Sequence, residues 1–323
     1  MIILRKGSIN KFYYEDASGT KIKNKDQLKY LDNLRIPPAY RDVEIFYVKN
    51  PKILFQGYDA ASRLQQIYSP EHCKKQCRKK FKALIDFGNT LPKIYADCDR
   101  YIANSRTTKN KIIGLIIKII SMCYFRIGNT KYLKLYNSYG ISNIKKSHVY
   151  VVSGGLKIEF IGKKGVTNTC IFTEKNIVHA IKDLLKNKSA NEHIFTYNEN
   201  GENILISAIE INNWLKSYNS NFTTKFFRTF DANVLLLEFM QQNHSSNNLA
   251  PNKISEAKRK KILAEAMRLV STHINNTAAI CRKSYIMPEL IELYFKHPLK
   301  FKSLFLNKLS PRTSFINFLK LQN

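Results

Sequence analysis

Acidic residues are scarce in this chain. Its 323 residues include 24 Asp and Glu against 53 Lys and Arg, which gives a formal net charge of +29. A basic excess of this size favours a polyanionic partner, most simply nucleic acid, over an uncharged small molecule. The chain is also rich in lysine, asparagine and isoleucine, so the bias of an A+T-rich genome is a second source of the excess.

Long apolar runs and nucleotide-binding loops are missing as well. The longest apolar run, residues 111–127, is interrupted by Lys118 and is shorter than the roughly 20 residues that a membrane span needs. No Gly-x4-Gly-Lys-Ser/Thr motif is present, so the sequence does not support work driven by ATP. It therefore predicts a buried core helix over this run and no membrane partner.

The six cysteines are spread through the chain, and the opening MIILRK is too short an apolar run for a secretory signal. Reduced thiols inside a cell are therefore expected. His72, Cys73 and Cys77 lie close together but lack a second pair at zinc-like spacing. We expect no metal and no cofactor, and an intracellular protein: virion and host cytoplasm if viral, the nucleus if cellular.

The chain is predicted to be β-rich at its start and mainly helical afterwards. Short aromatic and β-branched segments separated by turns fill residues 1–68. The basic segment HCKKQCRKKFK at residues 72–82 marks the boundary, either as a solvated helix face or as a clamp on phosphates. Helices are expected at residues 82–105, 111–127, 174–185, 204–218, 231–241 and 255–275. A β island of three strands is expected at residues 148–152, 156–161 and 167–172.

The stretch TAAICRKSYIMPELIELY predicts a short helix, a tyrosine and a second helix. Thr277 can cap the first helix, and Pro288 suits the first turn of the second. Tyr285 follows Arg282 and Lys283, and nearby cations lower the pKa of a phenol below its usual value of about 10. Tyr285 is therefore a candidate nucleophile; the alternative is a partly buried ring with a solvated hydroxyl.

Four separated pieces of the chain follow a specific order. They are RIGNTKY from Arg126, FIGK ending at Lys163, KFFRTF around Arg228, and NTAAICRKSY from Asn276 to Tyr285. In this order they resemble the type IB DNA topoisomerases, especially the small poxvirus, giant-virus and bacterial enzymes. The resemblance extends to IPPAY in the N-terminal part and covers nearly the whole chain.

The resemblance implies an α+β fold: a small antiparallel β-rich N-terminal domain, a larger mainly α-helical catalytic domain of the topoisomerase IB and tyrosine recombinase type, and a three-stranded β island. We place the N-terminal DNA-clamp domain at residues 1–78 and the catalytic domain at 79–323. The implied partner is double-stranded DNA, held by a monomer that closes around the duplex. Such a clamp needs a flexible junction, expected near residues 69–82.

The resemblance also implies a role for each residue of the motifs. Tyr285 would attack a backbone phosphorus and become joined to the 3′ phosphate. Arg126 and Arg228 would fork onto its non-bridging oxygens, Asn276 would donate a hydrogen bond, and Lys163 would protonate the departing 5′ oxygen. The residues expected to contact DNA are Gln65, Tyr68, Lys131 and Tyr132.

The sequence departs from the family pattern near these residues. Asn276 stands where poxvirus enzymes carry histidine, so hydrogen bonding and not proton transfer is expected of it. Phe226 and Phe230 replace an aspartate and a tryptophan around Arg228, which puts the local support of that arginine in doubt. Gln66 replaces an aromatic that relatives place near bases, so target-site preference does not carry over.

Structural roles compete with each catalytic assignment. Arg126 also fits a helix C-terminus, Lys163 an ordinary turn, Arg228 an ion pair with Asp231, and Asn276 a cap. Two other functions are compatible with the motifs: a tyrosine recombinase, which usually has His-x-x-Arg where this chain has KFFR, and a non-catalytic DNA-packaging protein. All five catalytic positions are filled, which favours an enzyme.

Overall fold

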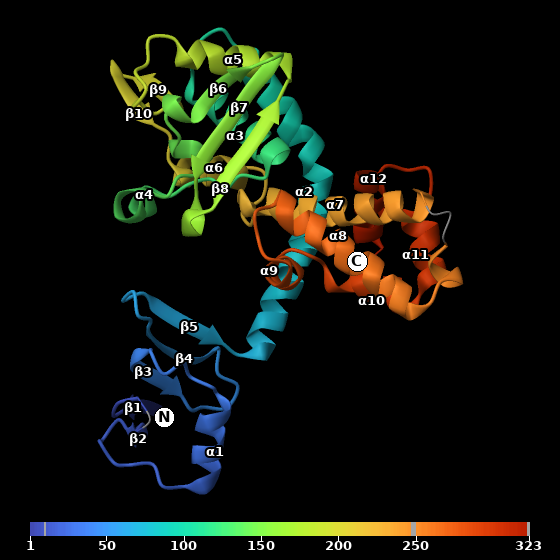
Figure 1. Ribbon diagram of the computed structural model, residues 1–323. Coiled ribbons are helices and arrows are strands. Elements are labelled where there is room, and N and C mark those ends of the chain that lie inside the picture. The colour runs from blue at the N-terminus through green and yellow to red at the C-terminus, as the bar shows by residue number, and fades with distance from the viewer. Residues whose placement is uncertain (10, 247–249, 322–323) are drawn as a thin grey trace. The chain divides into compact units, whose positions relative to one another are not determined.

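The computed structural model describes residues 1–9, 11–246 and 250–321. The chain divides into two compact units, Met1–Phe81 and Lys82–Asn323 (Figure 1). The division falls between Phe81 and Lys82, while the predicted domain boundary after residue 78 stays a prediction. Each unit is described by itself.

The first unit is a five-stranded antiparallel sheet in the order β2-β1-β3-β4-β5. Ile3 pairs with Ile45, and Ile45 pairs with Phe55, so alternation along three strands places these side chains on one buried face. Leu31 of helix α1 joins the same core. The strands are β1 (Ile2–Lys6), β2 (Tyr13–Asp16), β3 (Arg41–Phe46), β4 (Ile53–Tyr58) and β5 (Leu64–Tyr68), and α1 is Lys25–Asn33. The predicted β-rich start is confirmed.

The segment expected to be a flexible junction is helical. Helix α2 runs without interruption over Pro70–Ile102. Ser69 starts it: its Oγ accepts a hydrogen bond from the amide of His72 (3.2 Å), and its carbonyl accepts one from Cys73 (2.9 Å). A proline in the first turn and a run of lysines then suit a helix. The expected helix start at residue 82 is therefore wrong.

Helix α3 (Lys109–Cys123) is the central helix of the second unit. Its residues Ile112, Leu115, Ile116, Ile119 and Ile120 are all fully buried, as the long apolar run predicts. The helix contacts α7 (Lys225–Ser246) and β8 (Thr167–Phe172). It ends at Cys123 because Tyr124 adopts a left-handed conformation (φ 55°). In the described part of the chain, no helix is both long enough and apolar enough to cross a membrane.

The predicted β island is present as an antiparallel sheet in the order β6-β7-β8. Leu156, Ile158 and Phe160 alternate along β7 and are buried; Figure 1 shows the sheet beside α3. Its strands are β6 (Val149–Val152), β7 (Gly155–Ile161) and β8 (Thr167–Phe172). The turn between β7 and β8 holds the short helix η3 (Lys163–Gly165). This turn presents Lys163.

One hairpin overlaps the start of a predicted helix, at residues 204–205. Strands β9 (Thr196–Glu199) and β10 (Glu202–Leu205) pair around Asn200 and Gly201. Both turn residues have positive φ, 53° and 88°, and Asn-Gly is a strong signal for such a turn. The helix expected from residue 204 begins later, at Ala208.

The remaining helices complete the second unit. Those that carry or support the motifs are α4 (Thr130–Tyr136), α7 (Lys225–Ser246), α8 (Glu256–His273), α9 (Ala278–Ser284) and α10 (Pro288–Lys296). The others are α5 (Lys175–Leu185), α6 (Ala208–Lys216), α11 (Pro298–Phe305) and α12 (Pro311–Lys320). A β-rich start followed by a mainly helical unit with a three-stranded sheet confirms the predicted α+β fold class.

The expectation of six reduced thiols is wrong for one pair. Cys123 at the end of α3 and Cys170 on β8 form a disulfide. They are 47 residues apart in sequence and meet only because the β island packs on α3, so spacing alone did not reveal them. The remaining four cysteines carry thiols.

This pairing predicts a thiol count. Alkylation of the denatured protein without reductant should modify four cysteines, and prior reduction should raise the number to six, as read by intact mass. In Cys170→Ser, the count without reductant should be five, because Cys123 loses its partner. Six modified cysteines in the unreduced protein would show that the disulfide does not form.

Candidate active site

Four of the five predicted catalytic side chains lie together in the second unit. Nη2 of Arg126 donates a hydrogen bond to Oδ1 of Asn276 (3.0 Å). The guanidinium of Arg228 lies 5.6 Å from the centre of the Tyr285 ring. Nη2 of Arg228 and Nδ2 of Asn276 both donate to the carbonyl of Ile274, at 2.5 and 3.2 Å. Residues from three parts of the chain thus form one basic cluster, named the arginine pocket below.

The backbone of Arg126 is fixed by a close approach of two glycines. After the end of α3, the Arg126 carbonyl accepts a hydrogen bond from the amide of Ile141 (2.9 Å). A Cβ on Gly140 would lie 2.3 Å from the nitrogen of Gly128 and 2.7 Å from the carbonyl oxygen of Arg126. Only a residue without a side chain fits there, so Gly140 lets the two segments meet behind Arg126.

Replacing Gly140 with alanine should therefore displace Arg126. The new methyl meets backbone atoms, which cannot swing aside, so we expect a loss of stability of about 3 kcal/mol. The DNA relaxation that the family resemblance implies should be at least about tenfold slower. Urea unfolding and a relaxation time course measure the two effects. The control is Asn203→Ala, at an exposed position outside this site. An unchanged relaxation rate in Gly140→Ala would contradict this account of Arg126.

Arg228 is a buried cation whose hydrogen-bond donors are only partly used. It lies in the first turn of α7 and is 4% exposed, and its Nε and Nη1 have no hydrogen-bond partner in the described part of the chain. Burial lowers the pKa of Arg228, and the nearby charge of Arg126 lowers it further, yet a guanidinium stays charged at any relevant pH. Such donors suit an anionic ligand such as a phosphate.

The alternative ion pair between Arg228 and Asp231 is wrong. Asp231, on the same helix, instead binds Arg312 of α12, with an Oδ1 to Nη2 distance of 3.0 Å. The guanidinium of Arg312 also lies 5.3 Å from the centre of the Phe230 ring. The carboxylate nearest in sequence to Arg228 thus pairs with Arg312 instead. Phe230 is buried and helps to pack α7.

Tyr285 is held at the end of α9 by its backbone. Oγ1 of Thr277 accepts a hydrogen bond from the amide of Ile280 (3.3 Å), so the predicted cap of this helix is confirmed. The fully buried carboxamide of Asn233 donates to the carbonyl of Tyr285 (2.9 Å) and accepts from the amide of Met287 (2.8 Å). Asn233 therefore fixes the chain on both sides of the phenol, a role that the sequence did not reveal.

The phenol of Tyr285 ionises more easily than an ordinary tyrosine. Burial alone would raise its pKa, but the positive charges of Arg228 and Arg126 outweigh burial and lower the pKa below its usual 10.0. The sequence predicts this direction from Arg282 and Lys283. Both of those residues are exposed, so the cations responsible come from distant parts of the chain.

Asn276 follows a left-handed turn at the end of α8. Asn275 has φ 48°, and the amide of Asn276 donates to the carbonyl of Ser271 (2.9 Å). This turn aims the Asn276 side chain at Arg126. His273 is exposed, and its Nδ1 lies 2.9 Å from the carbonyl of Leu269, in agreement with the structural role expected of it.

The other predicted site residues of the second unit lie outside this pocket. Lys163 is exposed on the turn after β7, and among the described residues it has no hydrogen bond or ion pair with the other four. Lys131 and Tyr132 are exposed on α4. In the first unit, Nε2 of Gln65 donates to Asp59 (2.9 Å), and the hydroxyl of Tyr68 donates to Gln66 (3.0 Å).

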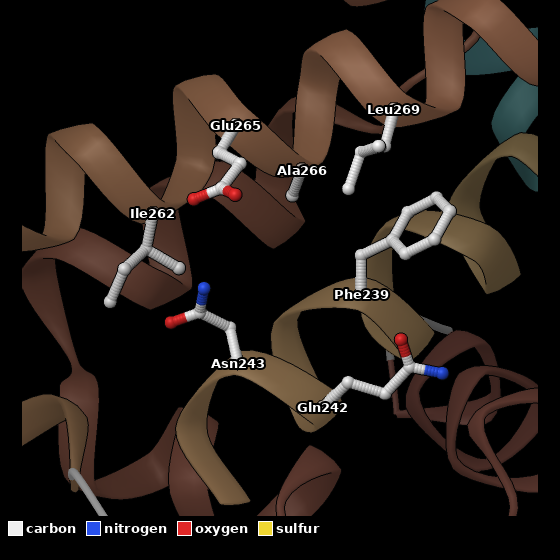
Figure 2. A pocket seen from close by; sticks show the side chains of 7 residues that line it. All are labelled: Phe239, Gln242, Asn243, Ile262, Glu265, Ala266 and Leu269. Carbon is white, nitrogen blue, oxygen red and sulfur yellow. The ribbon is translucent and has the colours of Figure 1, made fainter. Parts of the chain in front are cut away.

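A separate hollow between α7 and α8 has the wrong chemistry for a phosphate. The described residues that line it supply one carboxylate, two carboxamides and four apolar side chains, and no cation (Figure 2). Figure 2 shows the Glu265 side chain between those of Ile262 and Ala266 on α8. The phosphate backbone of a nucleic acid is therefore expected at the arginine pocket and not in this hollow.

Comparison with known proteins agrees with the motifs. The family model of the catalytic core of eukaryotic DNA topoisomerase I matches residues 69–296. The chain is also 30% identical over 301 residues to DNA topoisomerase 1B of Acanthamoeba polyphaga mimivirus, covering 92% of this chain and 88% of that relative. This chain belongs to the type IB DNA topoisomerases.

A second family model matches the N-terminal part of the enzyme. The family model of the N-terminal domain of bacterial DNA topoisomerase IB matches residues 11–59, within the β-rich unit. DNA topoisomerase 1B of Vaccinia virus (strain Western Reserve) is 23% identical over 268 residues, with 81% of this topoisomerase and 80% of the viral protein covered. The topoisomerase is thus an enzyme that acts on DNA. Its relatives include giant-virus and poxvirus proteins.

Proposed function

We propose that this topoisomerase relaxes supercoiled DNA by cutting and resealing one strand through a 3′-phosphotyrosyl intermediate on Tyr285, without ATP or an obligatory metal. The observation that carries the proposal is the convergence of Arg126 and Arg228 on Tyr285, which lowers the pKa of the phenol despite its burial. A half-buried phenol beside two cations is suited to attack a phosphodiester.

The cleavage step exchanges one phosphodiester for another. The Tyr285 oxygen attacks phosphorus and loses its proton, the bond from phosphorus to the 5′ oxygen breaks, and Lys163 gives that oxygen a proton. The free 5′ end rotates about the intact strand. Its hydroxyl then attacks the phosphotyrosyl bond, releases Tyr285 and restores the strand. Each step forms one phosphorus–oxygen ester bond for the one that it breaks. Resealing therefore needs no external energy source.

The arginines stabilise the charge that develops during transfer. Both non-bridging oxygens become more negative as phosphorus becomes five-coordinate, and fixed cations stabilise that state more than the starting ester. Nε and Nη1 of Arg228 are the donors left over by its bond to Ile274. Asn276 adds a neutral N–H donor, since its Oδ1 already accepts from Arg126. In other phosphoryl transfers Mg²⁺ supplies such charge.

We also propose which residues hold the DNA. We assign DNA contacts to Gln65 and Tyr68 in the N-terminal domain, residues 1–78, and to Lys131 and Tyr132 in the catalytic domain, residues 79–323. A net charge of +29 supports binding to a duplex backbone. A single chain, closing around the duplex as a clamp, supplies every group that the chemistry requires.

Relaxation of a plasmid tests the function. With EDTA present and ATP absent, the enzyme should relax both negatively and positively supercoiled plasmid to a ladder of topoisomers, because no step requires metal or nucleotide. A dependence on Mg²⁺ or ATP would contradict the proposal. Exchange of strands between two paired sites would indicate a recombinase, and tight binding without any relaxation would indicate a packaging protein.

A further inference from the structure

A buried carboxamide connects the Lys163 turn to the arginine pocket. Asn168 on β8 is 3% exposed. Its Nδ2 donates a hydrogen bond to the carbonyl of Val166 (2.8 Å), which belongs to the turn that presents Lys163. Its Oδ1 accepts a hydrogen bond from Nδ2 of Asn275 (3.1 Å). Asn275 immediately precedes Asn276, so one side chain joins the two turns.

The surroundings are shaped for this carboxamide. A Cβ on Gly162 would lie 2.5 Å from Nδ2 of Asn168, so glycine allows the turn to close over the side chain. Asn275 holds the left-handed conformation (φ 48°) that asparagine tolerates better than most residues. Both ends of the Asn168 amide are thus satisfied in a buried place, which fixes its orientation.

Lys163 needs such support more than the other four residues do. Arg126, Arg228, Asn276 and Tyr285 are linked by direct contacts, whereas Lys163 is an exposed lysine on a short turn. A general acid acts only within hydrogen-bond reach of the departing oxygen. The backbone of its turn must therefore keep a set position relative to the phosphate pocket.

We propose that Asn168 and Asn275 form a positioning pair that places the Lys163 amine at the 5′ leaving oxygen. The pair touches no reacting atom and acts through the Val166 carbonyl on one side and the backbone before Asn276 on the other. The inference rests on the proposed function, in which Lys163 is the general acid.

The test compares two leaving groups at one cleavage position, mapped beforehand with the unaltered enzyme. One duplex carries the ordinary 5′ bridging oxygen there, and the other carries a 5′ bridging sulfur. A thiolate leaves without being protonated, because the pKa of a thiol lies far below that of an alcohol. Single-turnover cleavage at saturating enzyme then separates loss of the general acid from general damage.

We expect Asn168→Ala and Asn275→Gly to cleave the oxygen duplex about tenfold more slowly, a part of the 10²–10⁴-fold that general acids contribute. Both should cleave the sulfur duplex at nearly the unaltered rate. Glycine keeps the left-handed turn at residue 275, so this variant retains the backbone. The double variant should be no slower than the slower single variant, because both remove one interaction. Asn203→Ala, an exposed site on β10, should cleave both duplexes normally.

Equal slowing on both duplexes would overturn the inference, as would normal cleavage of the oxygen duplex or additive effects in the double variant. Lys163→Ala, measured alongside, tells the two levels apart. If sulfur fails to rescue Lys163→Ala, the general acid itself is wrongly assigned. If sulfur rescues Lys163→Ala but neither asparagine variant, only the positioning pair is refuted.

Discussion

Tyr285→Phe is expected to bind duplex DNA as the unaltered enzyme does and to form no covalent adduct. The substitution removes one oxygen atom and leaves the ring beside Arg228, so the fold and the backbone bonds to Asn233 should persist. Without its nucleophile the cleavage rate should fall by at least about 10⁴-fold. Filter binding and a denaturing gel of end-labelled DNA measure the two properties.

The matched control for this variant is Tyr218→Phe. The hydroxyl of Tyr218 donates to Asp97, outside the arginine pocket, so its loss should leave the adduct intact. Adduct at the normal level in Tyr285→Phe would remove Tyr285 from the chemistry.

Arg228→Lys is expected to slow cleavage by about 10²-fold, which corresponds to about 3 kcal/mol in the barrier. The guanidinium uses Nη2 to bind the Ile274 carbonyl, and its Nε and Nη1 have no partner among the described residues. In the proposed mechanism these two donors bind the phosphate. A lysine carries one nitrogen and cannot make a planar fork, so the charge survives but the geometry does not. Single-turnover cleavage measures the loss.

The pH dependence separates charge from geometry at this position. The Arg228 cation lowers the pKa of Tyr285, so Arg228→Ala should raise that pKa and move the alkaline rise of the cleavage rate to higher pH. Arg228→Lys should leave the rise nearly in place. Arg100→Lys, at an exposed arginine paired with Asp97, should match the unaltered enzyme. Identical pH profiles for the alanine and lysine variants would contradict an electrostatic role for Arg228.

The sequence predicted those features that local chemistry determines. The isoleucine run could only be a core helix, and glycine turns defined the β island. The four residues of the pocket were predicted from the resemblance of their motifs, in this order along the chain, to those of a known family. The cations that lower the pKa of Tyr285 were not, since Arg126 and Arg228 approach the phenol only in the folded chain.

Features that depend on backbone contacts could not be predicted from the sequence. The Ile274 carbonyl and the Asn233 carboxamide bind other residues through main-chain atoms, and no motif marks such a partner. The disulfide of Cys123 and Cys170 likewise depends on the packing of β8 on α3. The β9–β10 hairpin was not predicted, although Asn200 and Gly201 are typical of its turn. The apolar residues that follow this turn also fit a helical period.

The most direct test of the account is to identify the residue that carries DNA in the covalent intermediate. The complex is trapped by denaturation during cleavage, digested with nuclease and protease, and analysed by mass spectrometry of the peptides. The account predicts a nucleotide joined through its 3′ phosphate to Tyr285. A nucleotide on any other side chain, or a 5′ phosphate linkage on Tyr285, would contradict it.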